Sequence, residues 1–470
     1  MLIVDESTSV ANVSCLVIYI KTTKNHQPVT FFFDLAPLKN KDAETVYNVI
    51  LQCLRSNGIT EKKLSDDFIQ LTCDGASTFT GNKSGVGKLF ANKYPKIVVW
   101  HCLAHRLELS IGDAKSCFRQ FDELVSILKS IYAFYSMSPK NTIEIQEISN
   151  DLGVTFKKIG KVFTIRWAAS SLSTVNAVLN NLEALKKHFH TKFIIEKDAS
   201  KKSRIKYILE NLRSSESLKN LQIMQKALEE TSVLSKQLQT KNMTLALGHK
   251  SIMNSVRALK AISDQSVDHK DEKIIPEKTF FRELTRSIKE RLFSTSNRKN
   301  MTKEEKVQNQ EAYFKTLSAY SLHNKTFWPK DWTITYGDDS IKKFAQKFGY
   351  CEIKMKAEFR TFKETSVIGD YFQNYVDHAN SYAISSADAE RGFSLMNRIV
   401  TDDRNALLVE NASSLMLISS IAMPIEEFAP KKFVKVWTLS HQNADSERNT
   451  YHATEKENGG DQKVLYDIFK

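Results

Sequence analysis

Two stretches near the start of the chain decide the fold class: residues 15–20, Cys-Leu-Val-Ile-Tyr-Ile, and residues 29–35, Val-Thr-Phe-Phe-Phe-Asp-Leu. Both are rich in β-branched and aromatic residues, which favour strands, and residues 25–28 between them predict a turn. A shorter apolar segment precedes them and ends in Asp5. The spacing predicts a meander of three antiparallel strands.

The chain then alternates between helical and strand patterns. Residues 42–55 carry apolar side chains at helical spacing, and Asn57-Gly58 stops this helix. A fourth strand, a second helix and a fifth strand are predicted at residues 68–73, 86–93 and 96–100. This order predicts an α/β fold with a mixed five-stranded sheet and resembles an RNase H-like core. It excludes a helical bundle for this part of the chain.

The middle of the chain has a different pattern. Apolar residues recur there at three- and four-residue spacing, which predicts amphipathic helices at residues 107–111, 121–135, 175–185, 205–238 and 245–262. We therefore expect an N-terminal core part at 1–165, a mostly helical insertion at 166–370 and a C-terminal core part at 371–437. Residues 406–423 predict a strongly apolar helix, and residues 438–470 a polar, mobile tail.

The composition limits the class of protein. At 470 residues the chain is long enough for two or three domains. No run approaches the roughly 18–20 apolar residues of a membrane-spanning helix, and the apolar start meets a carboxylate at Asp5, so neither a membrane span nor a signal peptide is expected. The six scattered cysteines are expected to be reduced thiols in an intracellular compartment.

The charge balance points towards polyanionic partners. The formal net charge is +13 and the isoelectric point about 9.2. Each phosphate that a basic protein neutralises releases counterions, which strengthens binding to nucleic acid. A well-solvated basic surface explains the same charge equally well.

Two aspartates stand where strands are predicted to end: Asp5, in Val-Asp-Glu-Ser-Thr, and Asp74, in Leu-Thr-Cys-Asp-Gly-Ala-Ser. If the first and fourth strands pair, the two carboxylates converge at one edge of the sheet. Such a pair is repulsive unless a divalent cation neutralises it, and Mg²⁺ prefers oxygen ligands. Taken singly, each aspartate is better explained as a turn cap.

Residues 385–394, Ser-Ser-Ala-Asp-Ala-Glu-Arg-Gly-Phe-Ser, add a third acid. Ser385, followed three residues later by Asp388, predicts a capping box that starts a helix. Glu390 then lies in the first turns of this helix, where its carboxylate can be directed at a neighbouring sheet edge.

The same stretch, with Asn397-Arg398-Ile399 and the apolar helix that follows, resembles the C-terminal region of hAT superfamily transposases. The resemblance implies an RNase H-like core interrupted by a large all-α insertion. It implies that Asp5, Asp74 and Glu390 are the catalytic acids and hold two Mg²⁺ or Mn²⁺ ions. Because this C-terminal region is the family's dimerisation domain, the resemblance also implies a homo-oligomer, at least a dimer.

Two shorter elements agree with this resemblance. Cys102 and His105, in His-Cys-Leu-Ala-His, match the family's Cys-x-x-His element, whose role the sequence does not define. Arg166 and Trp167, in Thr-Ile-Arg-Trp-Ala-Ala-Ser, match its Arg-Trp element, whose tryptophan stacks on a base flipped out of DNA. Without the family, Trp167 is more often a core anchor. Structural zinc is not expected, because no second ligand pair lies at suitable spacing.

The resemblance implies a nuclear, DNA-binding, transposase-like protein that, if active, cleaves and transfers DNA strands at an Asp-Asp-Glu site. The alternative is a domesticated, catalytically silent nuclear interaction protein that acts through dimerisation, similar to transposase-derived chromatin factors, transcriptional regulators or a SUMO ligase. The three acids favour the first. Members of the family carry an N-terminal DNA-binding region, commonly a BED zinc finger, whereas this chain begins four residues before Asp5. We therefore expect either a fragment or the loss of that region, which favours the second.

Overall fold

The computed structural model describes residues 1–81, 84–162, 167–295, 301–421, 429–431 and 434, with the side chains of 167–170 outside this description. The protein is a mixed α/β molecule, mostly helical, with one five-stranded mixed sheet built from residues 2–101. No helix in the described ranges is long and apolar enough to cross a membrane. All six cysteines are free thiols. The tail predicted at 438–470 lies outside the described residues.

The sheet contains the predicted meander. The strands β1 (Leu2–Thr8), β2 (Ser14–Lys24) and β3 (Gln27–Pro37) are antiparallel, and β4 (Gln70–Cys73) and β5 (Val98–His101) add to β1 in parallel. The turn between β2 and β3 is two residues long, because Asn25 and His26 both adopt the positive φ (51° and 61°) that such a hairpin requires. The resulting order is β3-β2-β1-β4-β5, with β1 at the centre.

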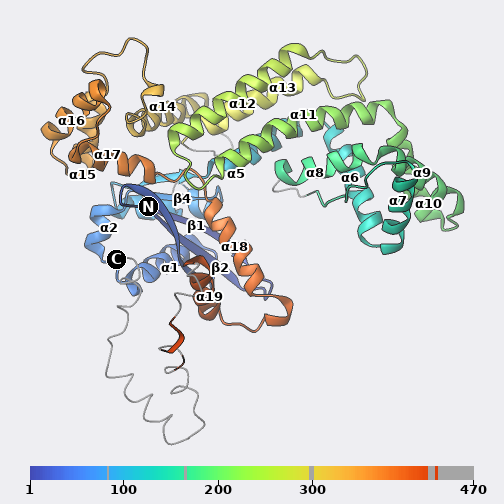
Figure 1. The fold of residues 1–470 in the computed structure, drawn as a ribbon, viewed down its shortest axis with the longest axis horizontal. Helices are drawn as coiled ribbons and strands as arrows, with labels where there is room; N and C mark the ends of the chain where they lie inside the picture. The colour runs from blue at the N-terminus through green and yellow to red at the C-terminus, as the bar shows by residue number, and fades with distance from the viewer. Residues whose placement is uncertain (82–83, 163–166, 296–300, 422–428, 432–433, 435–470) are drawn as a thin grey trace, which may run out of the picture.

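Helices cover both faces of the sheet (Figure 1). The helices α1 (Ala43–Ser56), α2 (Glu61–Asp67), α3 (Ser77–Thr80) and α4 (Val86–Lys93) pack on the face that carries Leu2 and Val4. The helices α18 (Ala387–Ile399) and α19 (Val409–Ile421) pack on the opposite face, with Ile3. The side chains of β1 thus alternate between two apolar clusters, as the two-residue period of a strand requires.

The segment between β5 and α18 contains helices and no strand in its described part. Figure 1 shows α11, α12 and α13 running side by side into an arm, with α6–α10 at its far end and α14–α17 beside the sheet. The bounds are α5 Leu103–Ser116, α6 Gln120–Ser136, α7 Pro139–Asp151, α8 Trp167–Asn180, α9 Leu182–Ile195, α10 Ala199–Arg213, α11 Ser215–Leu238, α12 Leu245–Gln265, α13 Glu277–Leu292, α14 Lys303–Tyr320, α15 Asp338–Phe348, α16 Glu352–Thr365 and α17 Asp370–Ser381.

Two runs predicted as single helices are each divided by a polar residue. Asn181 separates α8 from α9 because its side chain binds an extended segment: Nδ2 donates to the carbonyl oxygen of Lys157 at 2.6 Å, and Oδ1 accepts from the Lys157 amide at 3.1 Å. Ser214 divides α10 from α11, since its Oγ accepts from the amide of Ser217 at 3.0 Å and caps the new helix.

The capping box predicted at the start of α18 is wrong. The helix begins at Ala387, and its N-cap residue Ser386 makes no side-chain cap hydrogen bond. Ser385 Oγ instead accepts from the amide of Ala387 at 3.2 Å. Asp388 Oδ1 lies 2.6 Å from Nη2 of Arg391, one turn later on α18. This carboxylate is therefore paired with a side-chain cation and does not cap the helix N-terminus.

The helix α18 makes its closest approach to the sheet at Gly392. A Cβ atom at this position would lie 2.9 Å from a ring carbon of Tyr19 and 3.1 Å from a methyl group of Val17. Both are buried side chains of β2. Glycine therefore sets the distance between α18 and the sheet.

We expect Gly392→Ala to lower the free energy of unfolding by about 1–3 kcal/mol, because the added methyl group overpacks a buried contact. The matched control is Gly112→Ala, since Gly112 also lies inside a helix but has open space where its Cβ would stand. That change should raise stability by about 0.5–1 kcal/mol through helix propensity. Urea unfolding of both variants measures the difference, and a stabilised Gly392→Ala would contradict the close approach.

Candidate functional site

Asp5 and Asp74 lie on neighbouring strands. In the parallel pairing of β1 with β4, Ile3 stands opposite Thr72, and extending this register by two residues brings Asp5 opposite Asp74. The prediction that Asp5 ends its strand is wrong, because β1 continues its antiparallel pairing with β2 as far as Thr8. Asp5 lies instead just beyond the end of β4, where the parallel ladder has stopped.

Both aspartates belong to the face of the sheet that α18 covers. Side chains alternate along a strand, so Asp5 shares the face of Ile3, and Asp74 follows Thr72 with the same parity. Ile3 packs in the apolar cluster of α18. The hydroxyl of Thr72 donates to the carbonyl oxygen of Ala383, just before α18, at 2.8 Å. The register and this alternation together direct the two carboxylates to one region.

The two carboxylates are half-buried, and each accepts a hydrogen bond from a nearby backbone amide. Asp5 Oδ1 accepts from the amide of Glu6 at 3.0 Å, and Asp74 Oδ1 accepts from the amide of Ala76 at 3.1 Å. Burial raises the pKa of the Cys73 thiol well above its usual value, and the negative charges of Asp74 and Asp5 raise it further. Both charges are therefore close to the end of β4.

Glu390 lies on α18, which contacts β1 and β2. Its position depends on the segment before the helix, which is anchored next to β5. The amide of Leu103 donates to the carbonyl oxygen of Ile384 at 2.8 Å, and the amide of Ser386 donates to the buried Sγ of Cys102 at 3.2 Å. Glu390 follows one turn later and is half-buried.

The described side chains form no ready metal centre: no group of three or more His, Cys, Asp or Glu residues among them is arranged to hold an ion. The donor set formed by Asp5, Asp74 and Glu390 nevertheless suits Mg²⁺ or Mn²⁺, since it consists of carboxylate oxygens.

Cys102 and His105 lie at the start of α5, directly after β5, and have different surroundings. Cys102 is buried at the N-cap of α5, and its sulfur also lies 3.6 Å from Ser385 Oγ. It therefore joins the end of β5 to the segment before α18. His105 is half-buried on α5, with its ring centroid 5.6 Å from that of His101.

His101 is a buried group that the sequence analysis quoted but did not single out. It is 5 % exposed, and its Nε2 has no hydrogen-bond partner among the described residues. Gly75, the residue after Asp74, lies against its ring, since a Cβ there would be 2.5 Å from Nε2. Burial, and then the positive charge of Arg106, lower the pKa of His101 to about 2. His101 is therefore a neutral imidazole.

The buried cation behind His101 is Arg106, which has no carboxylate partner among the described residues. Its Nε donates to the carbonyl oxygen of His101 at 2.8 Å, its Nη1 donates to the carbonyl oxygen of Ser294, and its guanidinium lies 4.7 Å from the ring of Trp100. Burial lowers the pKa of Arg106 to about 10. This charge adds a positive potential behind the edge that carries Asp74.

Glu6 is a fourth acid beside the site, and the sequence analysis did not select it. Alternation directs it to the opposite face from Asp5, and its Oε2 is buried without a hydrogen-bond partner in the described structure. Burial raises the pKa of Glu6, the charge of Lys41 lowers it, and the charge of Asp74 adds to the rise. Its position directly after Asp5 was the signal available in the sequence.

The Arg166-Trp167 element largely lies outside the described residues. Trp167 begins α8, but its side chain and the whole of Arg166 are not described. The predicted roles of both residues therefore stay predictions.

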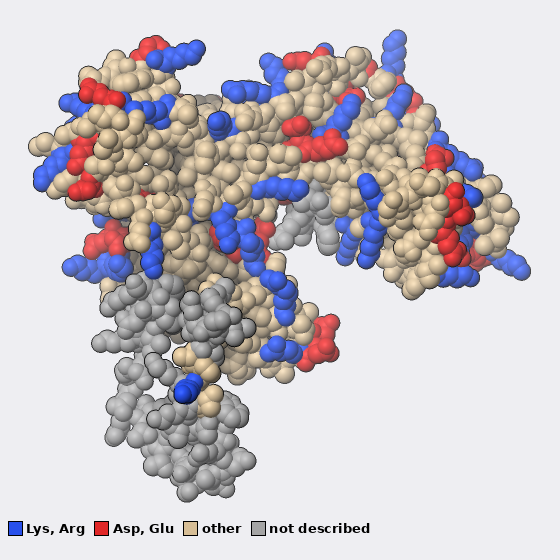
Figure 2. Space-filling model, in the orientation of Figure 1, with Lys and Arg blue, Asp and Glu red and all other residues tan. Residues whose placement is uncertain are grey.

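Basic side chains lie beside α18. Figure 2 shows Lys and Arg along α18 and on the surface of the helical arm that faces it. Lys21, Lys241 and Arg391 line a common recess beside α18. The acids on the sheet and these cations occupy the same face, which suits a ligand with phosphates.

No family model matches this chain.

We expect stability to fall as the pH drops below about 6.5, partly because of His101. In the unfolded chain the imidazole of His101 takes up a proton below about pH 6.5. In the folded chain the buried imidazole, with its pKa lowered to about 2, does not. Each such proton contributes a slope of up to about 1.4 kcal/mol per pH unit. His101→Gln should therefore flatten the dependence of unfolding free energy on pH between about pH 5 and about pH 7.5.

Urea unfolding across that range measures the slope. The control is His190→Gln, because His190 is an exposed histidine on α9. An equal slope in His101→Gln and the unaltered protein would contradict the burial of a neutral imidazole.

Proposed function

We propose that the chain is a hAT transposase-like protein with an RNase H-like core, which cleaves and transfers DNA strands at Asp5, Asp74 and Glu390. The observation that carries the proposal is the convergence of Asp5 and Asp74 on adjacent parallel strands, beneath the helix that carries Glu390. An antiparallel meander followed by two parallel strands supports the RNase H-like core. The residues between β5 and α18 add helices only, in their described part, which supports an all-α insertion.

The chemistry follows from the donor set. Mg²⁺ or Mn²⁺, when bound by Asp5, Asp74 and Glu390, would supply the positive charge that activates an attacking oxygen and stabilises a leaving one. In the reaction, water or a DNA 3′-hydroxyl loses a proton to solvent and forms a new P–O bond in line, the opposite P–O bond breaks, and the leaving oxygen takes up a proton from solvent. The side chains of this chain position the phosphodiester and hold the acids on one face.

DNA is the proposed partner and the nucleus the proposed site of action. The net charge of +13 and the basic surface along α18 support binding to a polyanion. On this proposal Arg166 contacts phosphate and Trp167 stacks on a flipped base.

A second candidate function is that of a nuclear interaction protein that dimerises through α19. The observation that favours it is apolar surface at this helix: Ile418 is 67 % exposed and Leu408, just before the helix, is 65 % exposed. The buried side of α19, with Ala412 and Met416, already packs on the sheet. A second apolar side on one helix needs a cover, which a second subunit would supply.

We expect the chain to nick DNA in the presence of Mg²⁺ or Mn²⁺ and Asp74→Asn to reduce that activity by at least about 100-fold, because an amide cannot replace a carboxylate ligand. Asp66→Asn, an exposed aspartate on α2, is the control and should retain full activity. DNA affinity measured in EDTA should be similar in all three proteins. Equal nicking by Asp74→Asn would end the catalytic proposal.

The dimer is tested separately by Ile418→Glu. Sedimentation velocity at micromolar concentration should show a dimer for the unaltered chain and a monomer for this variant, because a charge cannot be buried unpaired at an apolar interface. Lys187→Glu, on the distant helix α9, should leave the dimer intact. A strictly monomeric unaltered chain would contradict the second function.

A further inference from the structure

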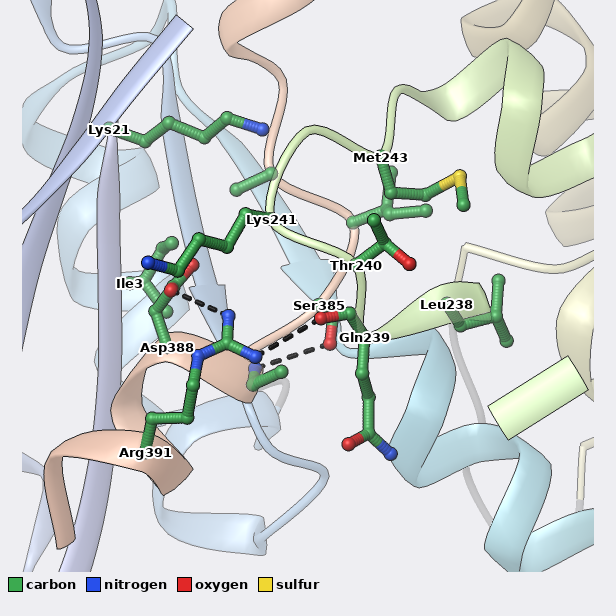
Figure 3. A pocket seen from close by; sticks show the side chains of 13 residues that line it. Ile3, Lys21, Leu238, Gln239, Thr240, Lys241, Met243, Ser385, Asp388 and Arg391 are labelled. Carbon is green, nitrogen blue, oxygen red and sulfur yellow. Dashed lines mark hydrogen bonds and ion pairs between the residues drawn. The ribbon is translucent and has the colours of Figure 1, made fainter. Parts of the chain in front are cut away.

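A small recess lies beside the candidate site, where three distant segments meet (Figure 3). The sheet contributes Ile3 and Lys21, the connection between α11 and α12 contributes Lys241, and the first turns of α18 contribute Asp388 and Arg391. Three of these five residues are cationic and one is anionic. The recess is therefore basic.

Lys21 is the unusual member of this group. It is 4 % exposed, yet its ammonium makes no hydrogen bond or ion pair with any described residue. Burial lowers the pKa of Lys21 to about 8, and the nearby charge of Asp388 raises it in part. The Lys21 side chain is thus mostly buried, and its ammonium lies at the wall of the recess without a paired carboxylate, so an anion in the recess would stabilise the charge.

Among the other charged side chains of the recess, Arg391 and Asp388 are paired with each other. Arg391 is held in place because Nη2 donates to Asp388 Oδ1 at 2.6 Å and Nη1 donates to the carbonyl oxygen of Gln239 at 3.1 Å. Asp388 is therefore already neutralised by a cation. The charges of Lys21 and Lys241 remain to attract a ligand.

The size of the recess selects a small group. Its cavity volume is about 10 Å³, which is room for one water-sized group. A phosphate oxygen can enter such a space while the rest of the phosphate stays at the mouth. A nucleobase is too large to enter.

We propose that this recess binds one backbone phosphate of DNA, with a phosphate oxygen against the Lys21 ammonium and with Lys241 and Arg391 at its mouth. The inference rests on the proposed function and deepens it, because the recess adjoins the acids. Ile3 lines it, and Asp5 lies two residues further along the same face of β1, about 7 Å away. Asp388 and Arg391 flank Glu390 on α18.

The recess therefore holds a phosphate one or two nucleotide steps from the one that reacts. Because the two sites are on the same strand of the sheet and the same helix, they are fixed relative to each other. The recess thereby determines which phosphodiester of the DNA strand lies at Asp5, Asp74 and Glu390.

The first test is protection of the exposed Lys241 amine, at the mouth of the recess, measured in EDTA on the full chain so that no catalysis is involved. The protein is treated with acetic anhydride, and acetylation of each lysine is measured by mass spectrometry without ligand, with duplex DNA, and with inorganic phosphate at the same phosphate concentration. We expect DNA to reduce acetylation of Lys241 several-fold, inorganic phosphate to have no effect, and Lys62, exposed on α2, to be unchanged.

Equal protection by inorganic phosphate would overturn the assignment to a DNA backbone in favour of a general anion site. Acetylation of Lys241 that DNA leaves unchanged, while the protein is saturated with DNA, would overturn the recess outright.

The second test uses Lys21→Met, which removes the charge and keeps an apolar stem in a buried position. Fluorescence anisotropy with duplex DNA at several salt concentrations should show an affinity lower by roughly three- to tenfold, and a slope of log affinity against log salt that is smaller by about 0.9, the value for one phosphate. Lys62→Gln is the control and should change neither quantity. Thermal unfolding confirms that both variants are folded.

An unchanged salt slope in folded Lys21→Met would overturn the proposal. Failure of the phosphate-binding proposal is distinguishable from failure of the proposed function. A chain that binds DNA through Lys21 but shows no metal-dependent nicking retains the recess and loses the catalytic role. A chain that nicks DNA with an unaltered slope in Lys21→Met retains catalysis and loses the recess.

Discussion

The side-chain amide of Gln70 is the contact on which the arrangement of the molecule depends. Its Nε2 donates to the carbonyl oxygen of Ala383, and its Oε1 accepts from the amide of the same residue, both at 2.8 Å. Thr72 adds a third hydrogen bond to Ala383, also at 2.8 Å. All of these groups are buried. An amide left unsatisfied there would cost about 1–3 kcal/mol, so the contact fixes the segment before α18 on β4.

The helical segment between β5 and α18 depends on the same contact. Its two ends are adjacent, because the amide of Leu103, at the start of α5, donates to the carbonyl oxygen of Ile384. A long insertion whose ends are held side by side adds little loop-closure entropy per residue and need not disturb the sheet. This explains how so many helices separate Glu390 from Asp5 and Asp74 in sequence while α18 still lies on β1.

The strands were predictable because their composition is local information. The β-branched and aromatic runs around Val17 and Phe32 predicted the meander, and the helix at Val86–Lys93 was predicted with its observed bounds. The helix Glu61–Asp67 was missed because Leu64 is its only apolar residue, so no periodicity marks it. Asn181 and Ser214 divide helices through side-chain contacts that an apolar pattern does not report.

The candidate site was predictable only in part. The order of strands and acids indicated that Asp5 and Asp74 would be neighbours, since parallel pairing of β1 and β4 follows from the topology. The buried states of His101 and Lys21 were not predictable, because each depends on segments distant in sequence. Arg106 and Gly75 surround His101, and α18 closes over Lys21. Burial of a polar group is a property of the assembled fold.

The late position of α18 has a consequence for synthesis on the ribosome. The sheet is complete at His101, but the helix that covers one of its faces begins at Ala387. At a synthesis rate of roughly 5–20 residues per second, the residues between them take roughly 15–60 seconds to emerge. Throughout that interval Ile3, Val17 and Phe32 present an uncovered apolar face. We therefore expect the nascent sheet to bind chaperones until α18 and α19 cover this face.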